Sequence, residues 1–378
     1  MARIALIGTG FVADYYATTL ANYPSLQVAG AFDTDPARLK EFCNHYGYAA
    51  YPGLDTALAD ATVDIVVNLT PPDHHYAINR TALEAGKHVY CEKPLAMEPG
   101  QAAELAELAA SKGLRISGAP ANALSDAQAL VAKLMAEGWI GTPRLAYAEM
   151  EDGAVFRDNW RDWRSVSGAH WPGLHEFEIG CTLEHAGYAL GWLIALFGPA
   201  KAVETFSALT FPNKGPGTEG LRLASDFSVG CIEFASGPVA RLTCGLAAPR
   251  DRSLTISGDE GTIIVRDLWD HRSPVHLSRF GEKGPFLLRL LGWYERKTGR
   301  HLPAKFFGGR VVSYQGKSDR RLPAYPSQID FAAGIADLAR GLDHGGEPVL
   351  DAKRAVHLTE LALALSRGGG RVDFDPAG

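Results

Sequence analysis

The segment from residue 3 to residue 33 limits the fold of this chain more than any other part of the sequence. Residues 3–7 form a short β-rich run, the hexapeptide GTGFVA follows at residues 8–13, and residues 11–22 favour a helix. Gly8 and Gly10 permit a tight turn and the close approach of a pyrophosphate to the helix N-terminus, while the small Ala13 lets helix and strand pack. The pattern therefore predicts a dinucleotide-binding βα unit.

An acidic residue, Asp33, ends the second predicted strand, residues 27–32. It follows the glycine turn by about 20 residues, a spacing that suits a carboxylate binding the ribose hydroxyls of adenosine. A carboxylate at this position would repel a 2′-phosphate, which favours NAD over NADP. Arg38 could still pair with such a phosphate, so NADP remains the weaker alternative.

Strand-like and helix-like segments continue to alternate up to about residue 121. Residues 63–69 are an almost continuous apolar run, as in a central parallel strand that is covered on both faces. Helices are predicted over 36–46, 74–85 and 99–112, and strands over 88–91 and 115–117. These repeated βα units predict an α/β Rossmann domain with a doubly wound parallel sheet over residues 1–121.

After residue 122 the pattern changes, and 378 residues are too many for one ordinary core. A helix is predicted over 125–137, a strand over 144–151, a Trp-rich loop over 157–172 and a helix over 182–197. Short alternating strands between 202 and 265 predict an antiparallel sheet, and amphipathic helices are predicted over 327–342 and 351–366. We therefore expect a second, α+β domain over residues 122–378.

Composition excludes several classes of protein. The formal net charge of −6 argues against general nucleic-acid binding. The five cysteines form no C-x-x-C pair, so neither a disulfide framework nor a zinc site is indicated. The first residues enter a strand at once and leave no room for a signal peptide, and the longest apolar run is too short to span a bilayer. The sequence predicts a cytoplasmic protein with no transmembrane segment.

Four motifs carry a family resemblance. The sequence CEKPLA at residues 91–96 ends a Rossmann strand, and NLTPPDHH at residues 68–75 precedes it. With EGWIGTP at 137–143 and DAKRA at 351–355, they resemble the glucose–fructose oxidoreductase / inositol dehydrogenase (Gfo/Idh/MocA) family. The resemblance implies that the second domain holds a large, mostly antiparallel open sheet, whose face often forms homodimers or homotetramers. It also implies hydride transfer between nicotinamide and a carbinol carbon of a sugar or polyol.

The resemblance places the active-site lysine of the family at Lys93. An ammonium group near the reacting oxygen stabilises a developing alkoxide and can relay a proton. The usual base of the family is a His four residues after an Asp, on the helix that follows the Trp-rich loop. Anchored on Gly187, those two positions hold His185 and Ala189, so the expected histidine is missing.

Two explanations remain for the missing histidine. Residues four apart share a helix face, so His185 can serve as the base from one turn earlier, with Tyr188 as the nearest substitute. An unperturbed histidine pKa of about 6.5 suits proton removal at neutral pH. Alternatively, the hydride chemistry is lost and the chain only binds a dinucleotide. The titratable cluster Glu176, Glu178 and Glu184 favours catalysis.

These arguments give a set of predicted site residues. The predicted catalytic residues are Lys93, His185 and Tyr188. The predicted cofactor contacts are Gly8, Thr9, Gly10, Phe11, Val12, Asp33, Thr34, Arg38, Leu69, Thr70, Pro71, His74, Glu92, Lys93 and Pro94. The predicted substrate contacts are Lys93, Asn122, Trp163, His185 and Tyr188.

Some of these residues allow a second interpretation. Where many family members carry Asn-Arg-Arg and use those side chains on substrate, this chain has Ala121-Asn122-Ala123. The tryptophans Trp160, Trp163 and Trp171 can stack on a sugar or fix a loop to the core. The spacing of His170, His175 and Glu176 fits no known metal-binding set, so no metal is predicted.

Residues 279–321, within an insertion of about residues 279–325, are strongly basic. They contain eleven Lys or Arg against three Asp or Glu, a charge of +8 in a chain of net charge −6. Three interpretations stay open: a solvated face, a lid that recognises phosphate through arginine, and an amphipathic helix resting on anionic lipid.

The predicted function is an NAD-dependent dehydrogenase of a sugar, a nucleotide sugar or a sugar phosphate. One alternative is net non-redox sugar chemistry, such as glycoside cleavage or epimerisation, through transient oxidation with NAD kept bound. The other is a non-catalytic dinucleotide-binding protein.

Overall fold

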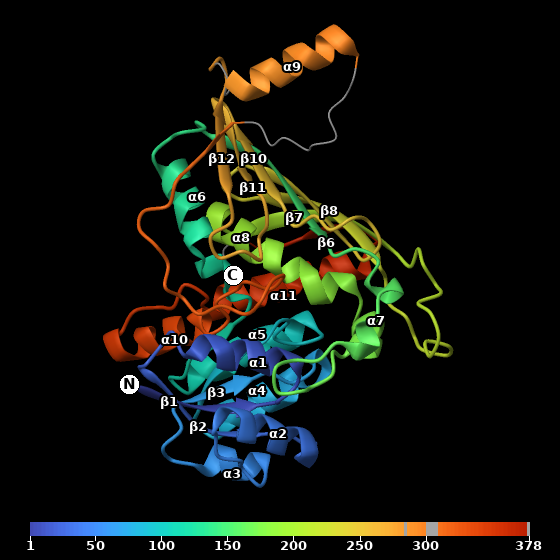
Figure 1. Ribbon diagram of the computed structural model, residues 1–378. Helices are drawn as coiled ribbons and strands as arrows, with labels where there is room; N and C mark the ends of the chain where they lie inside the picture. Colours follow the sequence, from blue (N-terminus) through green and yellow to red (C-terminus); the bar gives the residue numbers. More distant parts are fainter. Residues whose placement is uncertain (283–285, 300–308, 376–378) are drawn as a thin grey trace.

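Two structural units lie one above the other in the computed structural model, which describes residues 1–282, 286–299 and 309–375. The Rossmann unit is blue in Figure 1, and the second unit extends above it as a long twisted sheet. The long helix α11 (Ala352–Arg367) runs between them, so the end of the chain returns to the first unit.

The first unit is the predicted doubly wound parallel sheet. Its five strands are ordered β2-β1-β3-β4-β5, and all pair in parallel. Along β1, Ile4 and Leu6 belong to one apolar cluster and Ala5 and Ile7 to another, because the two faces of the sheet are covered by different helices. Its elements are β1 (Ala2–Ile7), α1 (Phe11–Leu20), β2 (Leu26–Phe32), α2 (Pro36–Tyr46), α3 (Leu54–Ala59), β3 (Ile65–Asn68), α4 (His75–Glu84), β4 (His88–Cys91), α5 (Pro99–Ser111) and β5 (Ile116–Gly118).

The second unit holds the expected large, mostly antiparallel sheet. In the part of the chain that the structure describes, nine strands follow the order β13-β12-β11-β10-β6-β9-β8-β7-β14, and β6 and β9 form its parallel pair. Its elements are α6 (Asp126–Ala136), β6 (Pro143–Glu151), α7 (Gly173–Ile179), α8 (Gly187–Phe197), β7 (Ala200–Ala208), β8 (Phe227–Phe234), β9 (Val239–Gly245), β10 (Leu254–Gly258), β11 (Gly261–Val265), β12 (Val275–Arg279), α9 (Phe286–Thr298), β13 (Arg310–Val311), α10 (Ala333–His344), α11 and β14 (Gly370–Asp373).

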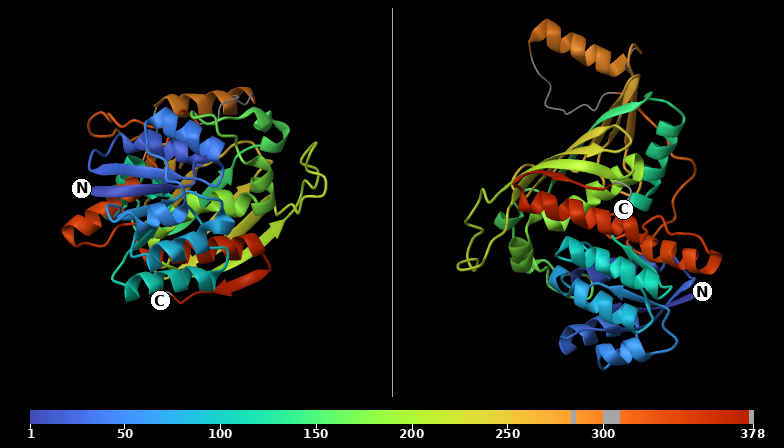
Figure 2. Two further views of the ribbon diagram at one scale, coloured as in Figure 1. Left: turned by 90° about the horizontal axis from the view of Figure 1, so that it is seen from below. Right: turned by 180° about the vertical axis from the view of Figure 1, so that it is seen from behind.

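The sheet is open on one side. Along β6, Ala146 and Ala148 are buried. Leu145, which precedes them, and Tyr147, which lies between them, are exposed. The buried face packs on α8, α11 and their neighbours, and Figure 2 shows these helices on one side of the sheet only. The period of two along the strand therefore separates a core face from a free face.

Three predicted elements differ from the structure. The helix predicted over 182–197 is a π-helical turn, Thr182–Ala186, that runs directly into α8. The helix predicted over 327–342 begins only at Ala333, because the preceding backbone is bound to the first unit, where the Ala332 N–H donates to Thr19 Oγ1 at 3.0 Å. The Gly-rich terminus forms β14, which pairs with β7.

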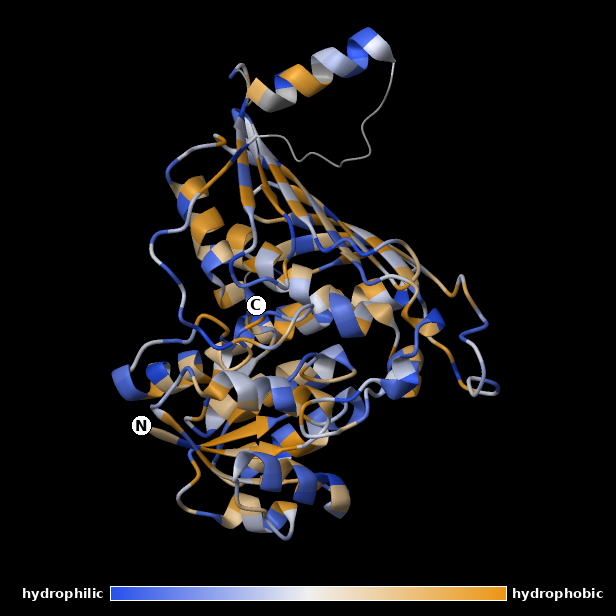
Figure 3. Ribbon diagram, in the orientation of Figure 1, coloured by the Kyte–Doolittle hydropathy of each residue, from blue (hydrophilic) through white to orange (hydrophobic). Residues whose placement is uncertain are grey.

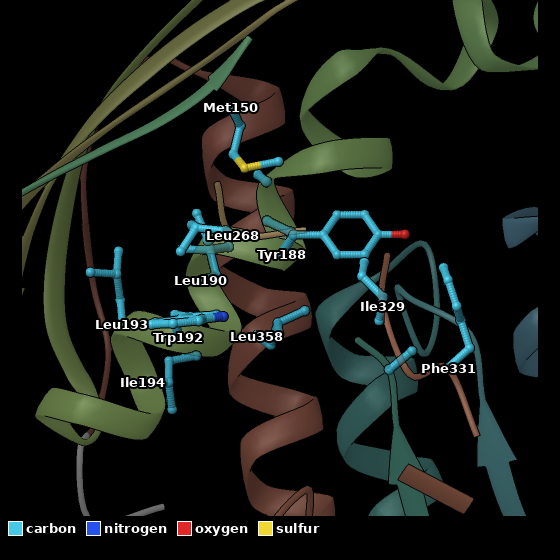
Figure 4. Close-up of a cluster of buried hydrophobic side chains, with 14 of the residues drawn as sticks. Met150, Tyr188, Leu190, Trp192, Leu193, Ile194, Leu268, Ile329, Phe331 and Leu358 are labelled. Atoms are coloured by element: carbon cyan, nitrogen blue, oxygen red, sulfur yellow. The ribbon is translucent and has the colours of Figure 1, made fainter. Parts of the chain in front are cut away.

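A buried apolar cluster holds α8 against α11. Leu190, Trp192 and Leu193 of α8 are fully buried, and Leu358 of α11 lies among them (Figure 4). The Tyr188 ring leaves this cluster, and its hydroxyl points away from the leucine side chains. The start of α8 is thus fixed by the core, while the Tyr188 hydroxyl points out of the apolar cluster.

The described residues contain no helix with the length and apolar character needed to cross a membrane.

Candidate active site

A cavity of about 520 Å³ lies where the parallel strands end and the second unit begins. Each of four strands places a residue at its wall: Gly8 follows β1, Asp33 follows β2, Leu69 follows β3 and Lys93 follows β4. Ligands of open parallel sheets bind at this edge, outside the carboxyl ends of the strands.

The glycine turn fits a dinucleotide. Gly8 has φ of 95°, and a Cβ there would lie 2.8 Å from the carbonyl carbon of Leu69, so only glycine fits. Gly10 precedes α1, and a Cβ there would meet nothing within 4 Å. The backbone at the start of α1 is therefore open to the cavity, as a bound pyrophosphate requires.

The Asp33 carboxylate is held by the residues around it. It accepts hydrogen bonds from the Thr9 N–H at 2.7 Å, from Arg38 Nε at 3.0 Å and from Arg38 Nη2 at 2.6 Å. Burial raises the pKa of Asp33, but these bonds outweigh it and lower the pKa below its ordinary value. Asp33 is thus an ionised acceptor at the wall of the cavity.

Most predicted cofactor contacts line the cavity, but two do not. Thr9 is fully buried and acts on Asp33, so it is not at the wall. Pro94 is also absent from the wall; its carbonyl oxygen lies 2.6 Å from His75 Nδ1, and the Thr70 oxygen lies 2.7 Å from His75 Nε2. The cavity residues from the predicted cofactor set are Gly8, Gly10, Phe11, Val12, Asp33, Thr34, Arg38, Leu69, Thr70, Pro71, His74, Glu92 and Lys93.

Lys93 lies at the inner part of the cavity, in an ion pair with Glu184. Its Nζ donates to Glu184 Oε2 at 2.9 Å, and both side chains are buried or nearly so, with 8% and 12% exposed. Burial lowers the pKa of Lys93, but the Glu184 carboxylate more than offsets it and raises the pKa above its ordinary value. Lys93 is therefore an ammonium group, and Nζ also lies 5.8 Å from the centre of the Tyr188 ring.

A second carboxyl group, Glu176, lines the same end of the cavity. Burial, followed by the negative charge of Glu184, raises the pKa of Glu176 well above its ordinary value. Burial raises the pKa of Glu184 as well, but Lys93 reverses the effect and lowers it. The pair therefore carries one negative charge, on Glu184, and one proton, on Glu176.

His185 lines the cavity next to this group and lies against a second carboxylate. Its Nε2 lies 3.2 Å from Asp152 Oδ2, and Asp152 Oδ1 lies 2.8 Å from Arg252 Nε. The Arg252 guanidinium is 1% exposed and stacks on Trp269, whose ring also meets His185 and Tyr188. This places the chain His185–Asp152–Arg252 at one wall of the cavity.

The imidazole of His185 is neutral. Burial lowers the pKa of His185 below its ordinary value, and the opposing effect of Asp152 is smaller. If Nε2 carries the proton toward Asp152, Nδ1 holds a free lone pair. Nδ1 is buried and has no hydrogen-bond partner among the described residues.

The π-helical turn explains why both Glu184 and His185 reach the cavity. A π-turn bonds residue i to residue i+5 and is frequent at functional sites. Here it lies just before Gly187, where a Cβ would meet the Lys93 side chain at 3.7 Å. The sequence comparison anchored on Gly187 predicted that His185 points into the cleft, and His185 does line the cavity. That comparison did not predict the contact of Glu184 with Lys93.

Two predicted substrate contacts, Asn122 and Trp163, do not line the cavity. Asn122 is 2% exposed, and its Nδ2 donates to the carbonyl oxygens of Tyr188 at 2.9 Å and Leu268 at 3.0 Å, so it is a structural residue. Trp163 packs on Trp171 at 5.1 Å and does not line the cavity; Trp171 does. The lining residues that were not predicted include Tyr15, Trp269, Ser327 and Phe331.

The described part of the basic segment, for which a phosphate lid was one interpretation, does not line the cavity. No described residue that lines the cavity comes from residues 279–321. Arg279 pairs with Glu260 at 2.7 Å, Arg320 pairs with Asp330, and Arg310 stacks on Trp139. Three of the basic residues, Lys283, Arg300 and Lys305, lie outside the described residues.

Among the residues that the structure describes, no three His, Cys, Asp or Glu side chains are grouped so that they could hold a metal ion.

The fold and the glycine turn together define an oxidoreductase with an NAD-binding Rossmann domain. The family model for Gfo/Idh/MocA oxidoreductases with an NAD-binding Rossmann fold matches residues 2–119, and the model of the family's C-terminal domain matches residues 129–264. The chain belongs to the Gfo/Idh/MocA oxidoreductase family.

Individual relatives agree with this assignment. The uncharacterized oxidoreductase YdgJ of Escherichia coli is 30% identical over 95% of this chain and 94% of its own length. Trans-1,2-dihydrobenzene-1,2-diol dehydrogenase of Mus musculus is 24% identical over 77% of this chain and 81% of its own. The WlbA dehydrogenase of Bordetella pertussis, solved with NADH and UDP-GlcNAcA, has the same fold, with 18% identity, a TM-score of 0.72 and coverage of 99% of this chain and 98% of that chain.

Proposed function

We propose that the chain oxidises a secondary hydroxyl of a sugar or a related diol and passes the hydride to NAD. The observation that carries the proposal is the continuity of the cavity from the glycine turn to the Lys93–Glu184 pair, with the neutral His185 beside it. Several relatives act on diols or sugars by their names, such as the mouse dihydrodiol dehydrogenase and a D-xylose 1-dehydrogenase of Hypocrea jecorina.

The residues divide the proton chemistry among them. When bound, NAD takes up the hydride that leaves the carbinol carbon. His185 accepts the hydroxyl proton, because it is the neutral base at this wall, and Asp152 stabilises the imidazolium that forms. The Lys93 ammonium faces the oxygen and stabilises its developing negative charge, while the Tyr188 phenol donates a hydrogen bond. Burial raises the pKa of Tyr188, which keeps it a donor.

The charges of the cavity favour an uncharged substrate ring. The basic side chains among its described lining residues, apart from histidines, are Lys93 and Arg38, and each is paired with a carboxylate. A phosphate group at the inner end would have no free cation and would face Glu184. Of the three predicted substrate classes, we therefore favour the free sugar or diol.

The function is tested by incubating the purified protein with NAD and a panel of sugars, diols and nucleotide sugars. We expect NADH to form in stoichiometry with an oxidised product, for uncharged members of the panel. Product without net NADH would instead indicate transient oxidation. If calorimetry detects NAD binding but no compound of the panel gives a product, the result would indicate a non-catalytic dinucleotide-binding protein.

The cofactor preference gives a second test. Asp33→Ser should shift the ratio of kcat/KM for NADP over NAD upward by at least about tenfold, because it removes the charge that repels a 2′-phosphate and frees Arg38 to bind it. Asp35→Ser is the matched control. The Asp35 carboxylate lies 3.7 Å from the Arg38 guanidinium, and it caps α2 by accepting from the N–H groups of Ala37 and Arg38, a role that serine can fill. An unchanged ratio in Asp33→Ser would contradict the assignment of Asp33.

The homodimer or homotetramer expected from the family resemblance remains a proposal. The free face of the long sheet exposes Leu145, Tyr147, Phe206 and Val239, large apolar residues that a second copy could cover. Light scattering of the purified protein tests it.

A further inference from the structure

The helix α9 stands apart from the rest of the molecule. It lies beyond β12 and the edge strand β13, at the end of the sheet farthest from the Rossmann unit, in the views of both Figure 1 and Figure 2. The cavity is lined by other parts of the described chain, so α9 has no place in the chemistry proposed above.

One face of α9 is apolar and uncovered. Phe286, Leu290 and Trp293 are spaced i, i+4 and i+7, which puts them on one side of a helix. They are 75%, 46% and 52% exposed, and the neighbouring Tyr294 is 36% exposed. Figure 3 shows apolar and polar residues alternating along this helix. A soluble domain rarely leaves such side chains together in water without a partner.

Basic side chains flank this apolar face, because Arg289 and Arg296 lie four residues before and three residues after Trp293. Arg289 and Arg296 are seven residues apart and therefore share a side of the helix, and both are exposed. Lys297 is also exposed, beside the apolar face, where a long stem can extend its charge past apolar neighbours. The whole segment 279–321 carries eleven Lys or Arg against three Asp or Glu, although the chain has net charge −6.

We propose that α9 binds the surface of a membrane that contains anionic lipid. Aromatic and leucine side chains on one face, with arginine and lysine at its border, suit an interfacial helix. The apolar side chains enter the acyl boundary, and the long basic side chains reach the headgroup charge. The charge of the segment is opposite to that of the lipid surface and to that of the rest of the chain. Since α9 lies at the far end of the sheet, a flat surface can meet it while the cavity stays open.

A vesicle experiment on the full-length protein tests the proposal. Co-sedimentation is measured with vesicles of phosphatidylcholine alone and with vesicles of equal parts phosphatidylcholine and phosphatidylglycerol. We expect binding to the mixed vesicles only, weakening as salt is added. Equal binding to both compositions, or binding to neither, would overturn the proposal.

Two variants of equal charge change locate the contact. Leu290→Asp places an acid on the apolar face of α9 and should weaken binding to the mixed vesicles about tenfold or more. Val311→Asp changes the charge of the same segment equally, but Val311 lies on β13 and is already 60% exposed. We expect it to weaken binding by less than about threefold. Equal losses in the two variants would refute a specific role of the apolar face.

Controls separate a fold defect and a protein partner from lipid binding. Both variants should keep the melting temperature and NAD affinity of the parent chain, since neither residue contacts the core or the cavity. If Leu290→Asp instead dissociates an oligomer in light scattering and the parent chain binds no vesicle, the face meets a second copy and the lipid proposal fails.

Discussion

Replacing Lys93 by methionine is expected to lower kcat/KM for sugar oxidation about a hundredfold to a thousandfold. Methionine keeps the length of the side chain and removes the ammonium group that faces the reacting oxygen. NAD affinity should change by less than about threefold, because the dinucleotide contacts of the glycine turn and Asp33 remain. Steady-state kinetics on the best substrate of the panel, with calorimetric NAD titration, measure the two effects.

A second variant separates catalysis from stability. Lys93→Met leaves the buried carboxylate of Glu184 unpaired, and breaking such a pair costs about 3–5 kcal/mol. The double variant Lys93→Met/Glu184→Gln removes that charge and should recover most of the lost melting temperature, yet stay as slow as the single variant. Turnover near that of the parent in the double variant would mean that Lys93 only neutralises Glu184.

The Rossmann unit could be predicted closely because its signals are local. The glycine turn, the continuous apolar strands and the acidic residue after β2 each define an element from its own sequence. The ends of parallel strands also meet at one edge of the sheet, so residues after those ends, such as Asp33 and Lys93, could be assigned to one site without knowing the packing.

The long sheet could be predicted only as a class. Alternating short strands indicate antiparallel pairing, but β6 finds its parallel partner in β9, with Leu145 opposite Val239. Register between strands so distant in sequence is set by which faces become buried, and no local pattern encodes it.

The two missed polar residues of the site share this origin. Asp152 follows the end of β6, and Arg252 precedes β10. They meet because β6 and β10 are antiparallel neighbours, with Leu254 opposite Ala148, which the sequence does not reveal. Trp269 reaches the cavity from a loop and stacks on Arg252, again with no local signal.

For Asn122 and Glu184, the sequence did not predict the direction in which the side chain points. Asn122 lies in a short 3₁₀ turn, and the carbonyl oxygens of Tyr188 and Leu268 turn its side chain inward. At the π-helical turn before Gly187, the phase of the helix shifts, so an alignment on that glycine could not give Glu184 its contact with Lys93.

Removing the proposed base should have the second large effect. His185→Ala is expected to lower kcat/KM about a hundredfold to ten-thousandfold, the range for a lost general base. The loss should be greatest at neutral and higher pH, where the parent imidazole is neutral. If His185→Ala keeps a rate close to that of the parent, Tyr188 rather than His185 accepts the proton. In that case Tyr188→Phe should show the large loss of kcat/KM.

Asp152→Asn tests whether Asp152 controls the pKa of His185. The measurement is the pH profile of kcat/KM. In the parent, kcat/KM should fall with acid only below the ordinary histidine pKa of about 6.5, because burial lowers the pKa of His185. Asp152 acts in the opposite sense and raises that pKa, so the asparagine variant should show a lower plateau and an acid limb moved further down in pH.

The control for this profile is Asp267→Asn. Asp267 also lies near Arg252, at 3.9 Å from Nη1, but makes no ion pair with His185. It should therefore leave the acid limb of the pH profile in place. If Asp152 served only to neutralise the buried Arg252, its loss would reduce melting temperature and plateau while the acid limb stayed where it is in the parent. If the acid limb of the pH profile does not move in Asp152→Asn, Asp152 has no part in the proton transfer. His185 would then have no partner that stabilises its charge.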